Sequence, residues 1–332
     1  MKNDGLIHDK LLEWAETYGP VYRLNVLHYV FLCVTCPEAT KEILMSSKYP
    51  KDEFVYTRLQ TLFGQRLFGN GLVTTRDHNQ WYKQRRIMDP AFSSLYLRGL
   101  IGTFNDRAEK LMDKLGDAAD NETEAFMLKL FNCVTLDVIA KVAFGQETTA
   151  NQLAFCVMEL ARHPEILEKV RTEVDDVIGM KQDIGYEDLG KLSYLSQVLK
   201  ETLRLYSTSP GISRQIEEDM VIDGIHIPGG VPCMFSSYAV GRMERFFKDP
   251  LKFDPDRFHP DAPKPYYCYY PFALGPRSCL GQNFAQMESK VVMAKLIQRF
   301  EFSLVPGQTF DIEDTGMLRP KSGVVCSIRH RK

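Results

Sequence analysis

One cysteine stands in a setting that could do chemistry. Cys279 lies in the stretch PFALGPRSCLGQ, residues 271–282, where two prolines and two glycines exclude a helix interior. The apolar spacing of QNFAQMESKVVMAKLIQRF predicts a helix that begins near Gln282. Free N–H groups at a helix N-terminus stabilise a thiolate. The pattern therefore indicates a thiolate held on a stiff turn.

The neighbours of this cysteine have matching chemistry. Gly275 and Gly281 let the backbone turn tightly and approach a flat ligand, and Arg277 could meet an anionic edge of that ligand. Phe272 could cover the sulfur. A thiolate that ligates haem iron needs these features: donors for its charge, shielding from water and a single ligand position. A buried cysteine on a turn is the alternative that this loop alone leaves open.

A second group of polar residues lies in LSYLSQVLKETLRLY. Glu201 and Arg204 are three residues apart, on one face of a predicted helix. The other positions of this helix are strongly apolar, which predicts partial burial of the pair, and Arg257 in FDPDRF is a third candidate partner. A solvated surface pair is the alternative, and such pairs contribute little.

A third pair lies in NQWYKQRR. Trp81 and Arg85 are four residues apart on one helix face, where an indole N–H and a guanidinium could both hydrogen-bond a carboxylate. The alternative is an ordinary amphipathic helix with a basic face.

Composition narrows the function classes. The 332 residues are 44% hydrophobic and 25% charged, which is typical of a globular chain, and the net charge of −2 gives no support to nucleic-acid binding. Eight cysteines are too few for a disulfide scaffold, so reduced thiols are expected, and the CxxC of Cys33 and Cys36 is interpreted as incidental.

Two other functional signals are absent from the sequence. No stretch is long and apolar enough to span a bilayer. The stretch GYEDLGKLS is interpreted as a chance near-match to a phosphate-binding loop, because Leu192 stands where that loop needs a residue with a hydroxyl group.

Periodicity predicts a mostly helical chain with small sheets. Two adjacent strands are expected in VYRLNVLHYVFLCVTC, then a helix from Pro37, loop to about residue 76, and a basic helix that ends near Pro90. Further helices are expected at residues 100–115 and 126–144, and at 147–179 with a break at Pro164. Short strands before an irregular loop at residues 242–270, and strands at the C-terminal end, complete the expectation.

Four motifs in order resemble the cytochrome P-450 family of haem-thiolate monooxygenases. They are W-x-x-x-R at residues 81–85, E-x-x-R at 201–204, FDPDRF at 253–258 and F-x-x-G-x-R-x-C-x-G at 272–281. The resemblance implies a mainly α fold with small β-sheets, haem b as cofactor and Cys279 as the axial iron ligand. It also implies roles for other residues: Trp81, Arg85, Arg214, Phe272, Arg277 and Gly281 in cofactor binding, and Glu201, Arg204 and Arg257 in a structural network.

The resemblance also implies a route for protons. Glu147 and Thr148 in GQETT would be the acid–alcohol pair that passes protons to bound oxygen, although polar residues in the first turn of a helix are the alternative.

The resemblance implies partners as well. Electrons would come from an NADPH-dependent cytochrome reductase. The candidate residues for docking it are Lys83, Arg86, Arg245 and Lys248, and the alternative is that these residues form an ordinary solvated surface. Three stretches resemble sterol side-chain hydroxylases of the family, namely LSYLSQVLKETLRLY, KDPLKFDPDRFHPDAPKP and GQNFAQMESKVVMAKLIQRFEFSLVPGQ. This resemblance implies a cholesterol-like substrate and the cytosolic face of the endoplasmic reticulum membrane.

The chain departs from the family pattern in one interval. The stretch from Arg85 to Glu201 is too short for the helices that roof the substrate pocket and the first half of the central helix. An internal deletion is expected near residues 144–145, so that residues 1–144 and 145–332 form one truncated domain without an N-terminal anchor. A non-catalytic haem-binding variant and an unstable product are the alternatives to an active monooxygenase.

Overall fold

The computed structural model describes residues 5–61, 68–139 and 146–331. The chain divides into two compact units, each described by itself. The first, called the sheet unit, comprises Met1–Pro90, Pro210–Leu251 and Pro265–Leu280. The second, called the helical unit, comprises Ala91–Ser209, Lys252–Lys264 and Gly281–Lys332. The expected junction at residues 144–145 lies outside the described residues.

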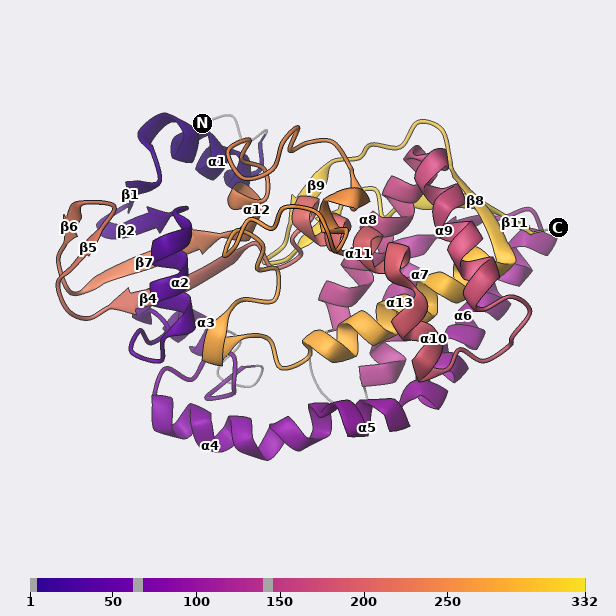
Figure 1. Cartoon of the computed structure of the whole chain (residues 1–332), viewed down its shortest axis with the longest axis horizontal. Helices are drawn as coiled ribbons and strands as arrows, with labels where there is room; N and C mark the ends of the chain where they lie inside the picture. The colour runs from indigo at the N-terminus through magenta and orange to yellow at the C-terminus, as the bar shows by residue number, and fades with distance from the viewer. Residues whose placement is uncertain (1–4, 62–67, 140–145, 332) are drawn as a thin grey trace. The chain divides into compact units, whose positions relative to one another are not determined.

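The sheet unit is built around a four-stranded sheet of order β1-β2-β7-β4 (Figure 1). Strand β2 pairs antiparallel with β1 and parallel with β7, and β4 pairs antiparallel with β7. The elements of this unit are α1 (Ile7–Tyr18), β1 (Val21–Val26), β2 (Tyr29–Val34), α2 (Pro37–Met45), α3 (Glu53–Thr61), α4 (His78–Met88), β4 (Gly211–Ile216), β5 (Met220–Ile222), β6 (Ile225–Ile227), β7 (Val231–Ser236), α12 (Ser237–Val240) and η3 (Gly275–Arg277).

Local chemistry sets the ends of these elements. Helix α2 begins at Pro37, where the missing N–H costs nothing, and the Asp77 carboxylate caps α4 by accepting from the Gln80 N–H at 2.5 Å. Val34 of β2, Phe235 of β7 and Ile43 of α2 are fully buried in one apolar cluster. This packing holds α2 against the sheet that carries Arg214.

The helical unit gathers its helices around α13 (Figure 1). Its elements are α5 (Ser94–Gly99), α6 (Ile101–Asp120), β3 (Glu124–Phe126), α7 (Met127–Ile139), α8 (Gln146–Arg162), α9 (Pro164–Val177), α10 (Tyr186–Lys191), α11 (Ser193–Leu205), η2 (Pro255–Phe258), α13 (Gln282–Arg299), β8 (Phe300–Leu304), β9 (Ile312–Asp314), β10 (Leu318–Pro320) and β11 (Val325–His330), and η1 (Asp89–Phe92) precedes them. Strands β3, β11 and β8 form an antiparallel sheet, and β9 pairs with β10.

The apolar stripes of these helices face one another. Phe104, Leu111 and Leu115 of α6 are buried at helical spacing, and Phe104 meets Phe284 of α13 edge to face at a ring-centroid distance of 5.1 Å. Helix α8 is buried along most of its length, which explains why its sequence is apolar over so many positions.

The expectations from sequence are largely confirmed. The first strand pair, the helix from Pro37, the break at Pro164 and the irregular loop before the cysteine all appear, and the fold is mainly helical with small sheets. The expectation of loop up to about residue 76 was wrong, because α3 lies within that stretch. No residue of α3 is buried, so its sequence lacks the apolar periodicity that reveals a helix.

Among the described residues, no helix combines the length and apolar character that crossing a membrane requires.

Candidate haem-binding site

Tight turns fix the cysteine loop in the sheet unit. The Cys279 N–H donates to the Phe272 carbonyl at 2.8 Å, and the Ser278 N–H donates to the Gly275 carbonyl at 3.0 Å. Ala273 and Gly275 both have left-handed backbone angles, with φ of 60° and 67°. The Cys279 side chain is exposed. The loop therefore presents a thiol at its surface on a closed backbone turn.

Gly275 brings this loop directly onto the end of helix α2. A Cβ atom at Gly275 would lie 2.2 Å from the Leu44 carbonyl oxygen and 2.7 Å from the Met45 Cα. Backbone occupies that space, so only glycine satisfies both the positive φ and the close approach. The expectation that Gly275 serves a tight turn is confirmed, and its contact with α2 is an additional finding.

Arg277 is held by carbonyl groups and an aromatic ring. Its Nη1 and Nη2 donate to the carbonyls of Thr75 and Arg76 at 3.0 and 3.3 Å. Its guanidinium carbon lies 4.1 Å from the ring centroid of Trp81, a buried side chain of α4. Within the described residues, no carboxylate forms an ion pair with Arg277. Backbone carbonyls and the Trp81 ring therefore hold the Arg277 guanidinium in place.

Arg214 is a second cation close to Arg277. Its side chain is 1% exposed, and its Nη1 donates to the Ser213 carbonyl at 2.8 Å. Burial lowers the pKa of Arg214, and a hydrogen bond with Tyr56 opposes that change. Burial, and then the charge of Arg214, lower the pKa of Arg277 to about 10. Two neighbouring guanidiniums, one of which lowers the pKa of the other, form a site suited to an anion, and the two propionates of haem are anions of the required kind.

Arg85 contacts the cysteine loop from helix α4. Its Nη1 donates to the Ser278 carbonyl at 2.8 Å, and its Nε pairs with Asp89 at 2.6 Å. Trp81 reaches the same loop through Arg277. The structure therefore brings together residues that the sequence separates widely: Trp81, Arg85, Phe272, Arg277 and Cys279.

Glu201, Arg204 and Arg257 form a network inside the helical unit. Arg204 Nε and Nη2 each donate to a Glu201 oxygen at 2.7 Å, and Arg257 Nε lies 3.4 Å from Glu201 Oε1. Glu201 Oε1 also accepts from the Asp254 N–H at 2.8 Å, and Arg204 Nη2 donates to the Lys252 carbonyl at 3.2 Å. Sequence predicted partial burial of Glu201 and Arg204 with Arg257 as a third partner, and the structure buries both members of the pair fully. The network joins α11 to the loop that contains η2.

The remaining predicted residues lie in the helical unit. Gly281 caps α13, and its carbonyl accepts from the Ala285 N–H at 2.9 Å. Glu147 is exposed in the first turn of α8, and Thr148 beside it is partly buried. Their proposed part in proton transfer stays a prediction.

Sequence reasoning missed the groups that hold the two arginines in place. Tyr56 of α3 bonds to Arg214, and the carbonyls of Thr75 and Arg76 hold Arg277. A backbone carbonyl has no sequence signal, and α3 was expected to be loop. The tyrosine in KDEFVYTR was the only available hint.

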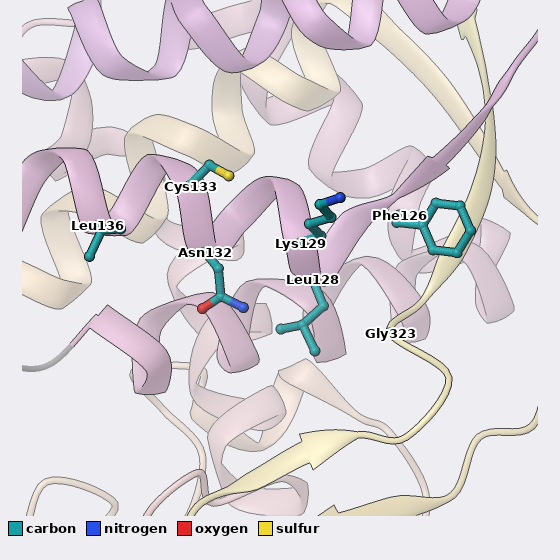
Figure 2. Close-up of a pocket in the computed structure, with 7 residues that line it drawn as sticks. All are labelled: Phe126, Leu128, Lys129, Asn132, Cys133, Leu136 and Gly323. Atoms are coloured by element: carbon teal, nitrogen blue, oxygen red, sulfur yellow. The ribbon is translucent and has the colours of Figure 1, made fainter.

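A separate pocket lies in the helical unit, and Figure 2 shows the residues that line it. Its volume is about 390 Å³, and its lining residues are Phe126, Leu128, Lys129, Asn132, Cys133, Leu136 and Gly323. None of the predicted site residues lines it. Its cysteine, Cys133, is exposed and provides a useful control thiol.

Comparison with known proteins decides the family. The family model described as Cytochrome P450 matches residues 1–147 and 145–327. This chain belongs to the cytochrome P450 family. Members of this family bind haem b, and the positive charges of Arg214 and Arg277 suit the propionate carboxylates of that cofactor.

Individual relatives cover only part of this match. Cytochrome P450 4d2 of Drosophila melanogaster is 39% identical over 193 residues, which are 56% of this chain and 38% of the relative. Cytochrome P450 3A6 of Oryctolagus cuniculus is 35% identical over 192 residues, with the same two coverages. Cytochrome P450 4d8 of Drosophila melanogaster is 28% identical over 299 residues, 84% of this chain and 62% of the relative. The chain thus spans 38% of the length of two of these P450 relatives and 62% of the third, which is less than two thirds in each case.

Proposed function

We propose that this chain is a haem-thiolate monooxygenase of the P450 family that hydroxylates a sterol side chain with O2 and electrons from a reductase. The observation that carries the haem assignment is the pair of neighbouring cations, Arg214 and Arg277, in the unit that presents Cys279; within the described residues, no carboxylate forms an ion pair with either of them. Two neighbouring cations modestly lower the free energy of unfolding of the chain. An anionic cofactor bound to them would offset this loss.

Each predicted residue takes a role in holding the cofactor. Cys279 would ligate the iron, and the cations would meet the propionates. The full set of cofactor-binding residues in this proposal is Trp81, Arg85, Arg214, Phe272, Arg277, Cys279 and Gly281. Thiolate ligation supplies electron density to the iron and favours O–O cleavage when haem is bound.

Two further groups support this chemistry. Glu201, Arg204 and Arg257 would keep α11 and the loop before the cysteine in one arrangement. Glu147 and Thr148 at the start of α8 would pass protons from solvent through water, as an acid–alcohol pair in which the Glu147 carboxylate takes up each proton before the carboxylic acid releases it.

The substrate assignment rests on resemblance alone. This proposal uses the resemblance of three stretches to cholesterol 24-hydroxylase: LSYLSQVLKETLRLY, KDPLKFDPDRFHPDAPKP and GQNFAQMESKVVMAKLIQRFEFSLVPGQ. The names of the P450 relatives found by comparison, such as 4d2 and 3A6, specify no substrate. Cholesterol is therefore the first compound to test, and the endoplasmic reticulum is the proposed location by analogy with that hydroxylase.

A truncated substrate pocket gives a second candidate function, haem binding without efficient catalysis. The family match comes in two segments that meet at residues 145–147, which supports an internal deletion at that point. Loss of the roofing helices would remove apolar contact with a sterol, at about 25 cal/mol for each Å². It would also admit water, which favours wasted reduction of oxygen.

Electron delivery requires a partner. Lys83 and Arg86 are exposed on α4, and Lys248 is exposed as well, so these residues are candidates for docking an NADPH-dependent cytochrome reductase. Charge reversal at Lys83 and Arg86 should slow haem reduction, and an unchanged rate would remove this docking assignment.

Product analysis separates the two functions. The purified chain with reductase, NADPH and cholesterol should consume NADPH and form peroxide, with far less hydroxycholesterol than a full-length sterol hydroxylase under the same conditions. Hydroxylation at the full-length rate would refute the loss of the pocket roof. A chain that takes up no haem would refute both functions.

A further inference from the structure

Lys51 is a buried lysine that the predicted site does not include. It is 8% exposed and immediately precedes Asp52 and helix α3. Its Nζ donates to the Val73 carbonyl and lies 4.6 Å from the ring centroid of Tyr56. Within the described residues, no carboxylate forms an ion pair with this ammonium. A lysine is rarely buried without a pair, so a further partner is expected.

Hydrogen bonds to backbone carbonyls place the Lys51 segment between the strand that carries Arg214 and the segment that holds Arg277. The Gln215 N–H donates to the Pro50 carbonyl at 2.7 Å, which ties this segment to the strand that carries Arg214. On the other side, Arg76 Nε donates to the Lys51 carbonyl at 3.0 Å. The Arg76 carbonyl in turn accepts from Arg277. The three cations Lys51, Arg214 and Arg277 thus share one region of the sheet unit.

The acidic groups of this region are engaged elsewhere. The Asp52 carboxylate accepts from the Ser213 hydroxyl and, at 2.8 Å, from the Val55 N–H. Glu53 lies 3.5 Å from Arg76. Tyr56 is hydrogen-bonded to Arg214, and burial raises the pKa of its hydroxyl. Burial first, then the charges of Arg214 and Arg277, lower the pKa of Lys51 to about 7.

We propose that Lys51 is a third cationic contact for the haem propionates and that its amine takes up a proton from solvent when haem binds. This inference rests on the proposed function. The neutral amine and one proton give an ammonium, which then faces a carboxylate. Without haem, the neutral Lys51 amine avoids repulsion from the charges of Arg214 and Arg277. With haem bound, all three side chains carry a positive charge.

The contribution of Lys51 to haem binding depends on pH in a definite direction. Below pH 7 the amine is already charged in the free chain, so haem gains the full benefit of Lys51. As the pH rises above 7, binding must also take up a proton, and the benefit declines until it disappears within about two pH units. Cys279 releases a proton when it ligates iron and acts in the opposite direction. The difference between wild type and a Lys51 variant isolates the lysine.

The test compares iron protoporphyrin IX with its dimethyl ester, in which both propionates are uncharged. Affinities are measured by absorbance titration from pH 6 to 9.5 for wild type, Lys51→Met, Lys51→Arg and the control Lys48→Met, an exposed lysine. At pH 6, Lys51→Met should weaken haem binding about tenfold, the contribution of one charge-assisted hydrogen bond, and leave the ester unaffected. Lys51→Arg should keep the benefit at high pH, and Lys48→Met should match wild type.

Four results would overturn the proposal. Equal weakening for haem and for the ester would show that Lys51 only supports the fold. A constant ratio of haem affinity between wild type and Lys51→Met across the pH range would exclude the proton uptake. If Lys51→Met is unstable, the ratio of the wild-type affinities for haem and for the ester across the same pH range takes its place. A chain that binds neither porphyrin would refute the proposed function and this inference together, whereas haem binding that is indifferent to Lys51 refutes the inference alone.

Discussion

Glu201 and Arg204 form a two-point ion pair within helix α11, with both donor–acceptor distances at 2.7 Å and both side chains fully buried. The carboxylate is shared with Arg257 and with the Asp254 N–H. A single glutamate therefore balances two arginines and anchors a loop. Removing its charge takes away a carboxylate that both arginines contact, which is more harmful than the loss of one hydrogen bond.

Glu201→Gln should lower the free energy of unfolding by about 3–5 kcal/mol, the usual consequence of breaking a buried ion pair. Urea or thermal denaturation followed by circular dichroism measures this loss. The matched control is Glu313→Gln, because the Glu313–Arg319 pair lies at 2.8 Å in the same unit but both side chains are about 40% exposed. The control should change stability by no more than about 1 kcal/mol. Equal effects of the two substitutions would contradict the structural role of Glu201.

Gly275→Ala should loosen the cysteine loop. The substitution combines a positive φ with a contact of 2.2 Å to the Leu44 carbonyl, so we expect destabilisation of at least about 1–3 kcal/mol and faster loss of haem. Gly102→Ala is the control, since Gly102 lies in helix α6 and an added Cβ meets nothing within 4 Å. That change should stabilise the chain by about 0.5–1 kcal/mol. Unaltered haem release from Gly275→Ala would show that the loop does not depend on this contact.

Glu288 gives the chain a specific dependence on pH. Its side chain is 1% exposed on α13, neither of its oxygens has a hydrogen-bond partner within the described residues, and burial raises its pKa to about 8. The folded-state pKa lies above that of the unfolded chain. The contribution of Glu288 to stability is therefore fully present below about pH 4.3 and is lost as the pH rises through 8.

Glu288→Gln should remove this dependence. At pH 5 the variant and wild type should be similar, whereas at pH 8 the variant should be the more stable, by up to about 1.4 kcal/mol for each pH unit crossed. Denaturation at a series of pH values measures the difference. Glu301→Gln, an exposed position on β8, should leave the pH profile as it is in wild type. Parallel profiles for Glu288→Gln and wild type would exclude a protonated Glu288.

Sequence predicted those parts of the fold that depend on local chemistry. Pro37 and Pro164 mark helix starts because their missing N–H has no partner at that position in any case. The burial of Glu201 followed from the apolar residues around it. The motifs also identified Trp81, Arg85 and Arg277, which the structure brings together.

Other features depend on contacts that no local pattern encodes. Helix α3 buries none of its residues, so periodicity could not reveal it. Arg277 is held by backbone carbonyls from residues about 200 positions away in the chain. The burial of Lys51 follows from the same long-range packing, and lysine is normally an exposed residue.

The reduced, carbon monoxide-bound absorption spectrum tests the central claim, that the Cys279 sulfur ligates haem iron. Wild type should give the red-shifted Soret band of thiolate ligation, and so should Cys133→Ser, which removes the other exposed cysteine among the described residues. Cys279→Ser should lose that band. A Cys279→Ser protein that takes up haem with an unaltered spectrum would contradict the assignment.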